Sequence, residues 1–227
     1  MEPVSLAQLR ANTLQVFRRG GGSRPDVLLV THHDAPAVLK DHNACDPVFA
    51  RVLGPVLAWR EARALLSLRS VAAVPNLLAR PDKRSLLLQY LPGEPLHKTQ
   101  TDVDWQAFFD RLREVLAQIH AHGIAHCDLR SPGNTLVTAA QNPVIVDFVA
   151  AVKKGASWNL CANWVFDRFR RADEQALLKL KRHVAPDLLS EQEQSSIDER
   201  TGLEKAARWL GGSIRRISRR MFTRVAP

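Results

Sequence analysis

The chain has 227 residues, of which 45% are hydrophobic, so it can build a packed core and is not intrinsically disordered. No apolar run is long enough to cross a membrane. The first residues, MEPVSLAQLR, lack the long apolar segment of a secretory signal, which predicts a cytoplasmic protein. The net charge of +9 favours anionic partners, and three widely spaced cysteines argue against a disulfide framework.

The first third of the sequence predicts short strands, turns and one helix. A glycine-rich turn at 18–26 precedes strand-like runs at 27–30 and 37–40. A helix is expected from Pro55 to about residue 70, because proline suits the first helical turn. Residues 76–80 and 85–91 then form a predicted hairpin, and PGEP at 92–95 interrupts the pattern as a linker between two lobes would.

The second part of the chain is predicted to be mainly helical. Apolar residues recur at helical spacing from about residue 102 to 122, where Gly123 is a suitable C-cap. Short strands follow at 134–138 and 144–152, and a further helix is expected from 165 to 184. The acidic stretch SEQEQSSIDE, from residue 190 to 199, predicts a solvated linker.

Two charged residues occupy positions where apolar side chains are expected. Glu61 shares a helical stripe with Leu57, Leu65 and Leu68, and a carboxylate there is costly unless it meets a cation. Lys40 ends the nearest predicted strand, so a buried Lys40–Glu61 ion pair would satisfy both charges. The alternative is two ordinary surface side chains, because charged residues are common at the ends of elements.

The stretch IAHCDLRSPGNTLV, residues 124–137, places several polar residues between two apolar runs. Asp128 has the carboxylate of a general base that acts on a hydroxyl. Asn134 offers a neutral oxygen to a divalent cation, and His126 can brace the loop by bonding to the backbone. A capped turn is the alternative, since Asp, Ser, Pro, Gly and Asn are also common turn residues.

A further carboxylate, Asp147, lies inside the apolar run VIVDFV, where it is costly without a cation. A hairpin between the strands at 134–138 and 144–152 would bring it close to Asp128. A magnesium ion held by Asp147 and Asn134, beside the base Asp128, would make a phosphoryl-transfer site.

The order of these features resembles that of the protein-kinase-like phosphotransferases. AVLK resembles their strand lysine motif, REARALL the helix glutamate, HCDLRSPGN the catalytic loop, and VDFV the metal-binding Asp-Phe-Gly. The likeness covers about residues 20–150. With only a short region after Phe148, the chain is similar to compact atypical kinases: the RIO-like kinases and the lipopolysaccharide core kinases that phosphorylate Kdo or heptose.

The resemblance implies an α+β, two-lobe protein-kinase-like fold with ATP and Mg²⁺ as cofactors. A small antiparallel-sheet N-lobe would span residues 1–91, and a reduced, mainly helical C-lobe residues 92–200. It assigns catalytic roles to Lys40, Glu61, His126 and Asp128, with Asp128 as base and Lys40, held by Glu61, on the α and β phosphates. Asn134 and Asp147 would bind the magnesium ion.

The nucleotide would also meet two backbone segments. Gly20, Gly21 and Gly22 would let their amides approach the phosphates, because they carry no side chain. The hinge, formed by Gln89, Tyr90 and Leu91, would give backbone hydrogen bonds to adenine.

The implied reaction is transfer of the γ-phosphate to a hydroxyl-bearing acceptor, first of all by an atypical Ser/Thr kinase. A lipopolysaccharide core sugar kinase at the inner membrane is the alternative within the fold, and a nucleotide-binding pseudokinase scaffold the alternative outside enzymes. The triple glycine departs from G-x-G-x-x-G, and Asn134 follows Asp128 by six residues instead of five, which favours the pseudokinase. The presence of all four of Lys40, Glu61, Asp128 and Asp147 favours an active enzyme.

The end of the chain is strongly basic. Residues 201–227 hold one Lys and six Arg against one Glu, which is +6 of the net charge of +9. Apolar residues recur at helical spacing within 203–224, which predicts a basic amphipathic helix. It either packs on the second lobe or makes a peripheral contact with an anionic membrane, and the absence of an aromatic stacking platform gives no strong nucleic-acid signal.

Overall fold

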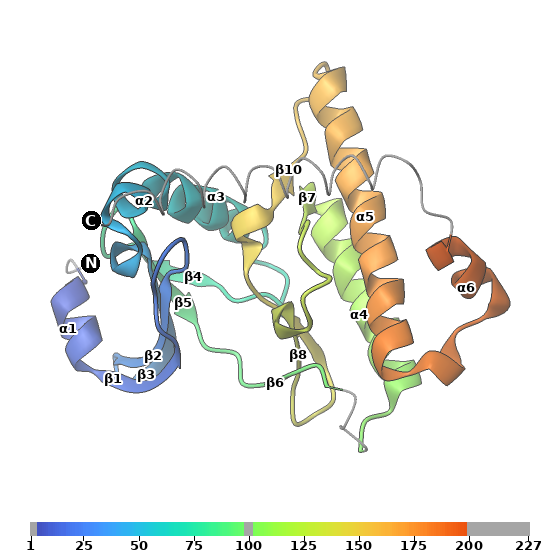
Figure 1. The fold of residues 1–227 in the computed structure, drawn as a ribbon, viewed down its shortest axis with the longest axis horizontal. Coiled ribbons are helices and arrows are strands. Elements are labelled where there is room, and N and C mark those ends of the chain that lie inside the picture. Colours follow the sequence, from blue (N-terminus) through green and yellow to red (C-terminus); the bar gives the residue numbers. More distant parts are fainter. Residues whose placement is uncertain (1–3, 98–101, 199–227) are drawn as a thin grey trace, which may run out of the picture. The chain divides into compact units, whose positions relative to one another are not determined.

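The computed structural model of the chain describes residues 4–97 and 102–198. Those up to Leu188 form one compact unit, and those from Leu189 onward belong to a second. The first unit carries a sheet and several helices, as Figure 1 shows, and it contains every predicted site residue.

A five-stranded antiparallel sheet forms the beginning of this unit. In spatial order its strands are β1 (Thr13–Arg18), β2 (Asp26–His32), β3 (Ala35–Asp41), β5 (Ser85–Gln89) and β4 (Leu77–Ala79). Lys40 of β3 pairs with Val27 of β2 and with Leu86 of β5. Because side chains alternate along a strand, Lys40 and Val38 lie on one face and Leu39 lies on the other.

Each face of the sheet is covered by a different helix. Helix α1 (Leu6–Ala11) packs against the face that bears Leu39, where a small apolar cluster forms. Helix α3 (Gly54–Ser67) packs on the other side, next to β4 and β5, and follows the short helix α2 (Pro47–Val52). The alternation of β3 therefore directs Lys40 toward α3 and its carboxylate Glu61.

One apolar core joins α3 and β5 to the helical part of the unit. Helices α4 (Trp105–Ala121) and α5 (Leu160–Val184) contribute to the same cluster as Leu65 of α3 and Leu86 of β5. The largest fully buried side chains of this core include Leu68, Leu86, Leu96, Phe108, Phe109, Leu112, Ile119, Ile124 and Phe148. Sheet and helices thus share their main source of hydrophobic stabilisation.

Small sheets connect the helices and carry the loops of interest. Strand β6 (Glu94–Pro95) pairs with β8 (Thr135–Val137), which pairs with β9 (Pro143–Ile145), and β7 (Ile124–Ala125) pairs with β10 (Val152–Lys153). One-turn 3₁₀ helices lie at His42–Ala44, Pro132–Asn134, Phe148–Ala150 and Pro186–Leu188.

Most predicted elements are present, with shifted ends. The hairpin β4–β5 and the helix from Gly54 are confirmed, and α5 begins at Leu160, five residues before its predicted start, where Asn159 caps it. The predicted linker after residue 189 is wrong, because residues Glu191–Asp198 form helix α6. Ser190 and Glu193 close a reciprocal capping box at its start, with bonds of 3.1 and 3.2 Å.

Other predictions lie beyond what the structure tests. The basic segment 203–224 falls outside the described residues. The proposed lobe boundaries at residues 91 and 200 stay predictions. Within the described residues, no helix combines the length and the apolar character required to cross a bilayer.

Candidate active site

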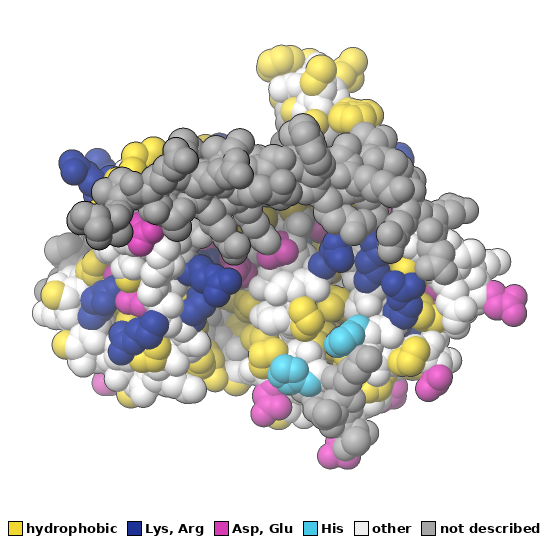
Figure 2. Space-filling view, viewed as in Figure 1, with side chains coloured by type: hydrophobic (Ala, Val, Ile, Leu, Met, Phe, Trp, Pro, Cys, Tyr) yellow, Lys and Arg dark blue, Asp and Glu magenta, His cyan; other side chains and the backbone are white. Residues whose placement is uncertain are grey.

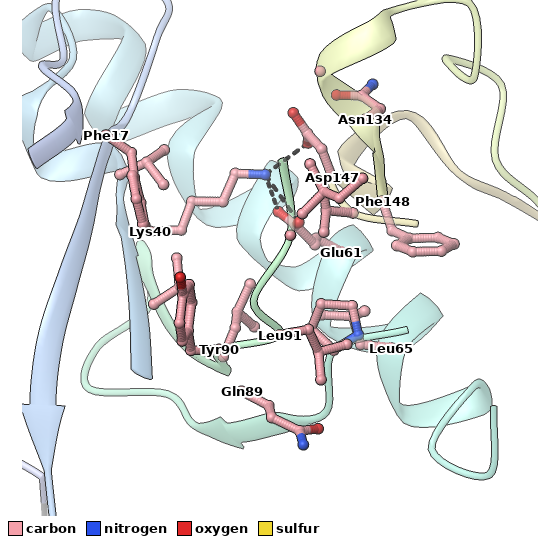
Figure 3. A pocket seen from close by; sticks show the side chains of 18 of the residues that line it. Phe17, Lys40, Glu61, Leu65, Gln89, Tyr90, Leu91, Asn134, Asp147 and Phe148 are labelled. Atoms are coloured by element: carbon pink, nitrogen blue, oxygen red, sulfur yellow. Dashed lines mark hydrogen bonds and ion pairs between the residues drawn. The ribbon is translucent and has the colours of Figure 1, made fainter. Parts of the chain in front are cut away.

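The buried lysine and glutamate predicted to pair do so, and a third residue joins them. The Nζ of Lys40 lies 2.9 and 2.7 Å from the two carboxylate oxygens of Glu61. It also donates to Oδ1 of Asp147 over 2.7 Å, as the dashed lines in Figure 3 show. Lys40 and Glu61 are 5% and 1% exposed, so both charges are withdrawn from water and stabilised by each other.

The electrostatics of this triad favour the charged forms of Lys40 and Asp147, whereas burial raises the pKa of the Glu61 carboxyl. Burial alone would lower the pKa of Lys40, but the carboxylates of Glu61 and Asp147 outweigh burial and raise it. Burial likewise opposes ionisation of Asp147, but the Lys40 ammonium more than compensates and lowers the pKa of this carboxyl. An ammonium and a partly exposed carboxylate therefore stand together at neutral pH.

Asp147 is held in an uncommon backbone conformation. Its φ and ψ of 67° and 69° are left-handed, which few residues other than glycine adopt. The next side chain, Phe148, is fully buried and meets the His126 ring edge-on with ring centres 4.7 Å apart. The core thus fixes the position of Asp147, and such strain in an ordered core is typical of functional sites.

The loop that carries Asp128 is anchored by a residue that the sequence analysis did not single out. Asp173 of α5 is 1% exposed, and its carboxylate accepts the backbone N–H groups of His126 and Cys127 over 2.6 and 2.8 Å. His126 in turn bonds through Nε2 to the carbonyl of Val146 at 3.0 Å and accepts from the N–H of Asp128 at 3.2 Å. His126 therefore braces the loop, as expected, instead of facing the cavity.

Asp128 and Asn134 are brought together as the sequence predicts. Asn134 donates its Nδ2 to the carbonyl oxygen of Asp128 at 2.9 Å and to its carboxylate at 3.1 Å. Asn134 is buried, whereas Asp128 is exposed to solvent. The strand pair β8–β9 supports the arrangement, since the N–H of Val146 donates to the carbonyl of Asn134 at 2.9 Å.

A cavity of about 450 Å³ opens beside the triad. In Figure 3, Asp147 lies between Lys40 and Asn134 along its edge. Its walls are mainly apolar and come from the sheet, from α3, from β8 and from the residue that follows β9: Val27, Val38, Leu65, Leu88, Leu136 and Val146. Gln89, Tyr90 and Leu91 line it as predicted for the hinge, where the β3–β5 ladder ends at Gln89. Its volume and apolar walls suit a small organic ligand.

The glycine turn is not brought into this cavity. The N–H of Gly20 donates to Asp26 at 2.6 Å, that of Gly21 to the carbonyl of Arg24 at 3.0 Å, and that of Gly22 to Asp46 at 3.2 Å. All three amides are thus engaged within the protein, two of them by carboxylates. Their contact with phosphates stays a prediction that this geometry does not favour.

Residues just before the glycine turn line the cavity instead. Phe17 and Arg18, at the end of β1, both contribute to its wall. The Phe17 ring stacks on Tyr90 with ring centres 6.3 Å apart and an angle of 20° between the planes. Arg18 also acts on Asp147, since its charge helps to lower the pKa of that carboxyl.

The sequence does contain a pattern that identifies Asp173 as a buried carboxylate. Asp173 shares a buried helical stripe of α5 with Phe166, Ala176, Leu177 and Leu180. A carboxylate on an apolar stripe is the same pattern that identified Glu61. No local pattern marks Arg18, since a cation at the end of an edge strand is ordinary.

Comparison with solved structures identifies the fold. The chain is similar to the Rio2 kinase from Chaetomium thermophilum in its ADP/Mg²⁺-phosphoaspartate complex, with a TM-score of 0.56 and 18% identity over 84% of this chain and 64% of that one. A second structure of that kinase gives a TM-score of 0.54 and 19% identity over 83% and 64%. The chain has a protein-kinase-like α+β fold, as its sequence predicted.

Sequence comparisons give shorter matches. The chain is 31% identical over 103 residues to the maternal embryonic leucine zipper kinases of Xenopus tropicalis and Xenopus laevis. Each match covers 42% of this chain and only 16% of the relative, so the chain spans a small part of those proteins. No family model matches the sequence.

Proposed function

We propose that the chain is an ATP- and magnesium-dependent kinase that transfers the γ-phosphate to a hydroxyl group of an acceptor. The observation that carries this proposal is the position of Lys40 between Glu61 and Asp147 at the edge of an apolar cavity. A fold match alone would leave function open, because one fold serves many activities. Here a lysine and two carboxylates are in contact as well, and groups of these kinds position phosphates and their metal in phosphoryl transfer.

The side chains at the cavity edge fit a magnesium ion. Since Nδ2 of Asn134 is used toward Asp128, its Oδ1 is the atom left to face a cation. Asp147 adds a carboxylate, and hard oxygen atoms of these two kinds suit Mg²⁺. No cluster of three His, Cys, Asp or Glu side chains suited to a metal occurs among residues 4–97 and 102–198. Magnesium often binds through one or two protein groups together with substrate phosphates, which matches this pair.

We propose that the same cavity holds the nucleotide. Val27, Val38 and Leu88 of the sheet would cover one face of adenine, and Leu136 the other. Tyr90 and Leu91 follow the end of the β3–β5 ladder, where their backbone groups would bond the base edge. Lys40 would meet the α and β phosphates, as the likeness to kinases suggests.

Arg18 supplements Lys40 on the phosphates in this proposal. The glycine amides are bonded to Asp26, to the carbonyl of Arg24 and to Asp46, so backbone donors are not free at the turn. Arg18 lies two residues before Gly20 and lines the cavity. Its side chain is exposed, so its guanidinium can reach an anion there. A guanidinium forms strong charge-assisted bonds with phosphate oxygens.

The chemistry would be mostly positioning and charge neutralisation. When bound, ATP supplies the phosphoryl group and magnesium neutralises charge on the phosphates. Asp128 accepts the proton of the acceptor hydroxyl, and Asn134 holds the Asp128 carboxylate in place. Asp173 fixes the backbone of the loop through the N–H groups of His126 and Cys127.

A protein hydroxyl is the acceptor that we propose first, because the similar proteins are described as kinases of the Rio2 and maternal embryonic leucine zipper kinds. The lipopolysaccharide core sugar remains the alternative acceptor. A pseudokinase is the second candidate function, favoured by the engagement of all three glycine amides.

Transfer of labelled phosphate from [γ-³²P]ATP tests the proposal. The purified chain would be incubated with magnesium and either a protein mixture or a Kdo- and heptose-bearing lipopolysaccharide. Label in protein supports the first acceptor and label in glycolipid the second. Nucleotide binding without transfer to either, or to the chain itself, would favour the pseudokinase.

A further inference from the structure

The start of α5 exposes an unusual group of large apolar side chains. Trp158, Leu160, Trp164 and Val165 are 81%, 76%, 59% and 37% exposed, and we call these four residues the apolar tip. No residue of α5 before Phe166 is buried. Figure 1 shows this end of α5 projecting beyond β10, and Figure 2 shows hydrophobic side chains gathered there without charged ones. Such concentrated apolar exposure marks an interaction site more often than a neutral surface.

The apolar tip is a built structure and not a loose loop. Asn159 caps α5 by accepting the N–H of Ala162 at 3.0 Å, and Asn163 donates to the carbonyl of Ala156 at 3.0 Å. A side chain at Gly155 would meet Cβ of Ala162 at 2.8 Å, so the incoming loop packs closely on the first helical turn. Both tryptophans are thus presented on a fixed frame, which lowers the entropic cost of docking.

Cations outnumber carboxylates around the apolar tip, where the exposed Asp167 follows Trp164 by three residues and pairs with Arg170 at 3.8 Å. The sequence holds no Asp or Glu between Asp147 and Asp167. Lys153 and Lys154 are exposed just before the tip, and Arg168 and Arg171 follow it on the helix. Leu160, Trp164, Arg168 and Arg171 are spaced by four, four and three residues, so the apolar and cationic side chains share one helical stripe.

We propose that the apolar tip docks this chain onto an anionic lipid membrane. Tryptophan favours the interface between hydrocarbon and headgroups, and neighbouring lysine and arginine are attracted to anionic lipids. Arg168 lies about 6 Å behind Trp164 along the helix axis, close to the depth of a headgroup layer. Tip and cations therefore match the apolar and charged layers of one leaflet.

The positive charge around the apolar tip argues against two other binding partners for it, a second copy of the chain and the chain's own segment 201–227. A second copy of the chain would bring its own Lys153, Lys154, Arg168 and Arg171 against the same cations, which costs electrostatic free energy. The segment 201–227 carries a net charge of +6 and is repelled for the same reason. An anionic surface instead gains from every one of these charges.

Docking would also fix where the candidate active site faces. Asp173, which holds the Asp128 loop, lies on the same helix nine residues after Trp164, about 14 Å along the axis. An acceptor at the membrane surface would come within reach of the loop. The docking inference does not depend on catalysis, because it rests on side chains outside the cavity.

Vesicle sedimentation of the full chain tests the inference. Wild type should sediment with equimolar phosphatidylglycerol and phosphatidylcholine vesicles, and much less with phosphatidylcholine alone. Trp158→Ser/Trp164→Ser should weaken this binding at least about tenfold, since two large side chains no longer enter the interface. Trp158→Phe/Trp164→Phe should retain most of the binding, and tryptophan emission of wild type should be quenched by brominated lipids.

Trp59→Ser is the matched control, since Trp59 is 47% exposed on α3 and lies outside the tip. It should bind vesicles like wild type. Lys153→Gln/Lys154→Gln should weaken binding to anionic vesicles only. Equal sedimentation of wild type and Trp158→Ser/Trp164→Ser would overturn the inference and assign any binding to another segment, such as 201–227. Absence of wild-type sedimentation, including a case where light scattering shows self-association instead, would overturn it as well.

Discussion

The carboxylate of Asp173 accepts the backbone N–H of His126 over 2.6 Å, although 47 residues separate the two in the chain. The same carboxylate accepts from Cys127 and contacts His120, so one buried side chain organises the loop that carries Asp128. Cys127 has a φ of 69°, which is unfavourable for a residue other than glycine and persists only where surrounding contacts hold it. The helix α5 thereby sets the geometry of a loop that it does not adjoin in sequence.

Asp173→Asn should therefore damage both stability and turnover. The new NH₂ group would face a backbone N–H, which leaves buried donors unpaired and costs about 2–3 kcal/mol in unfolding free energy. Phosphate transfer should fall while magnesium-ATP affinity changes little, because Asp173 lies outside the cavity. Urea unfolding and calorimetric ATP titration measure the two effects. Asp167→Asn, on the exposed side of α5, is the control and should stay within about 0.5 kcal/mol of wild type.

Asp147→Asn should remove the magnesium-dependent part of nucleotide binding. Wild type should melt at a higher temperature with magnesium-ATP than with ATP and a chelator, since a ligand of the folded state stabilises it. The variant should show no difference between these conditions. Asp128→Asn is the matched control: it should keep the thermal shift but lose at least about 10²-fold in transfer rate. An unchanged magnesium effect in Asp147→Asn would place the metal elsewhere.

Lys40→Met tests the buried triad by a double-mutant cycle. Removal of the ammonium leaves Glu61 as an unpaired buried carboxylate, which should cost about 3–5 kcal/mol. Lys40→Met/Glu61→Met should recover much of that loss, because an apolar pair of similar volume can replace a buried ion pair. ATP binding should stay weak in both variants. If the stability losses of Lys40→Met and Glu61→Met add up to the loss of the double variant, the ion pair contributes no coupling free energy.

The Lys40–Asp147 contact should make stability depend on acidic pH. Lys40 depresses the pKa of Asp147 below the ordinary 3.8, so the carboxylate stabilises the folded state at higher pH. This contribution is fully present above the unfolded-state pKa and is lost as pH falls through the lower folded-state pKa. Wild type should lose more unfolding free energy than Asp147→Asn between about pH 5 and about pH 2. Parallel urea-unfolding curves for the two proteins across that range would contradict the assignment.

Arg18→Gln should weaken ATP binding without affecting adenosine. The charge of Arg18 is proposed to act on the phosphates, so ATP affinity should fall by about 5- to 50-fold while adenosine affinity stays constant. Arg19→Gln removes an adjacent exposed cation that does not line the cavity, and it should leave both affinities unchanged. If both variants lose ATP affinity equally, the effect belongs to the general positive field. A wild type that binds no ATP would instead refute the proposed function.

The central site could be predicted from sequence because its residues follow local rules. In the sequence, Lys40 ends an apolar run, Glu61 interrupts an apolar helical stripe, and Asp147 interrupts an apolar run, so each breaks a periodic pattern. Asp128 and Asn134 are six residues apart, and a hairpin brings Asp147 back to them. Breaks in apolar periodicity and contacts made by a single hairpin can both be recognised from one sequence.

The surroundings of the site depend on contacts that no local pattern encodes. Arg10 reaches Asp26 and Asp41, so helix α1 fastens the strand that follows the glycine turn. The amide of Gly20 then bonds Asp26, which removes it from the cavity edge. From sequence the turn looked free to bind phosphate, because glycine composition reports backbone freedom and not the hydrogen bonds that the fold supplies.

The apolar core that α3 and β5 share with α4 and α5 has a thermodynamic consequence. Elements packed in one cluster lose their contacts together, so the sheet cannot melt while the helices stay folded. Calorimetry of this unit should show one cooperative transition, with equal calorimetric and van't Hoff enthalpies. A nucleotide bound beneath the sheet would then protect α5, and with it the apolar tip, from heat.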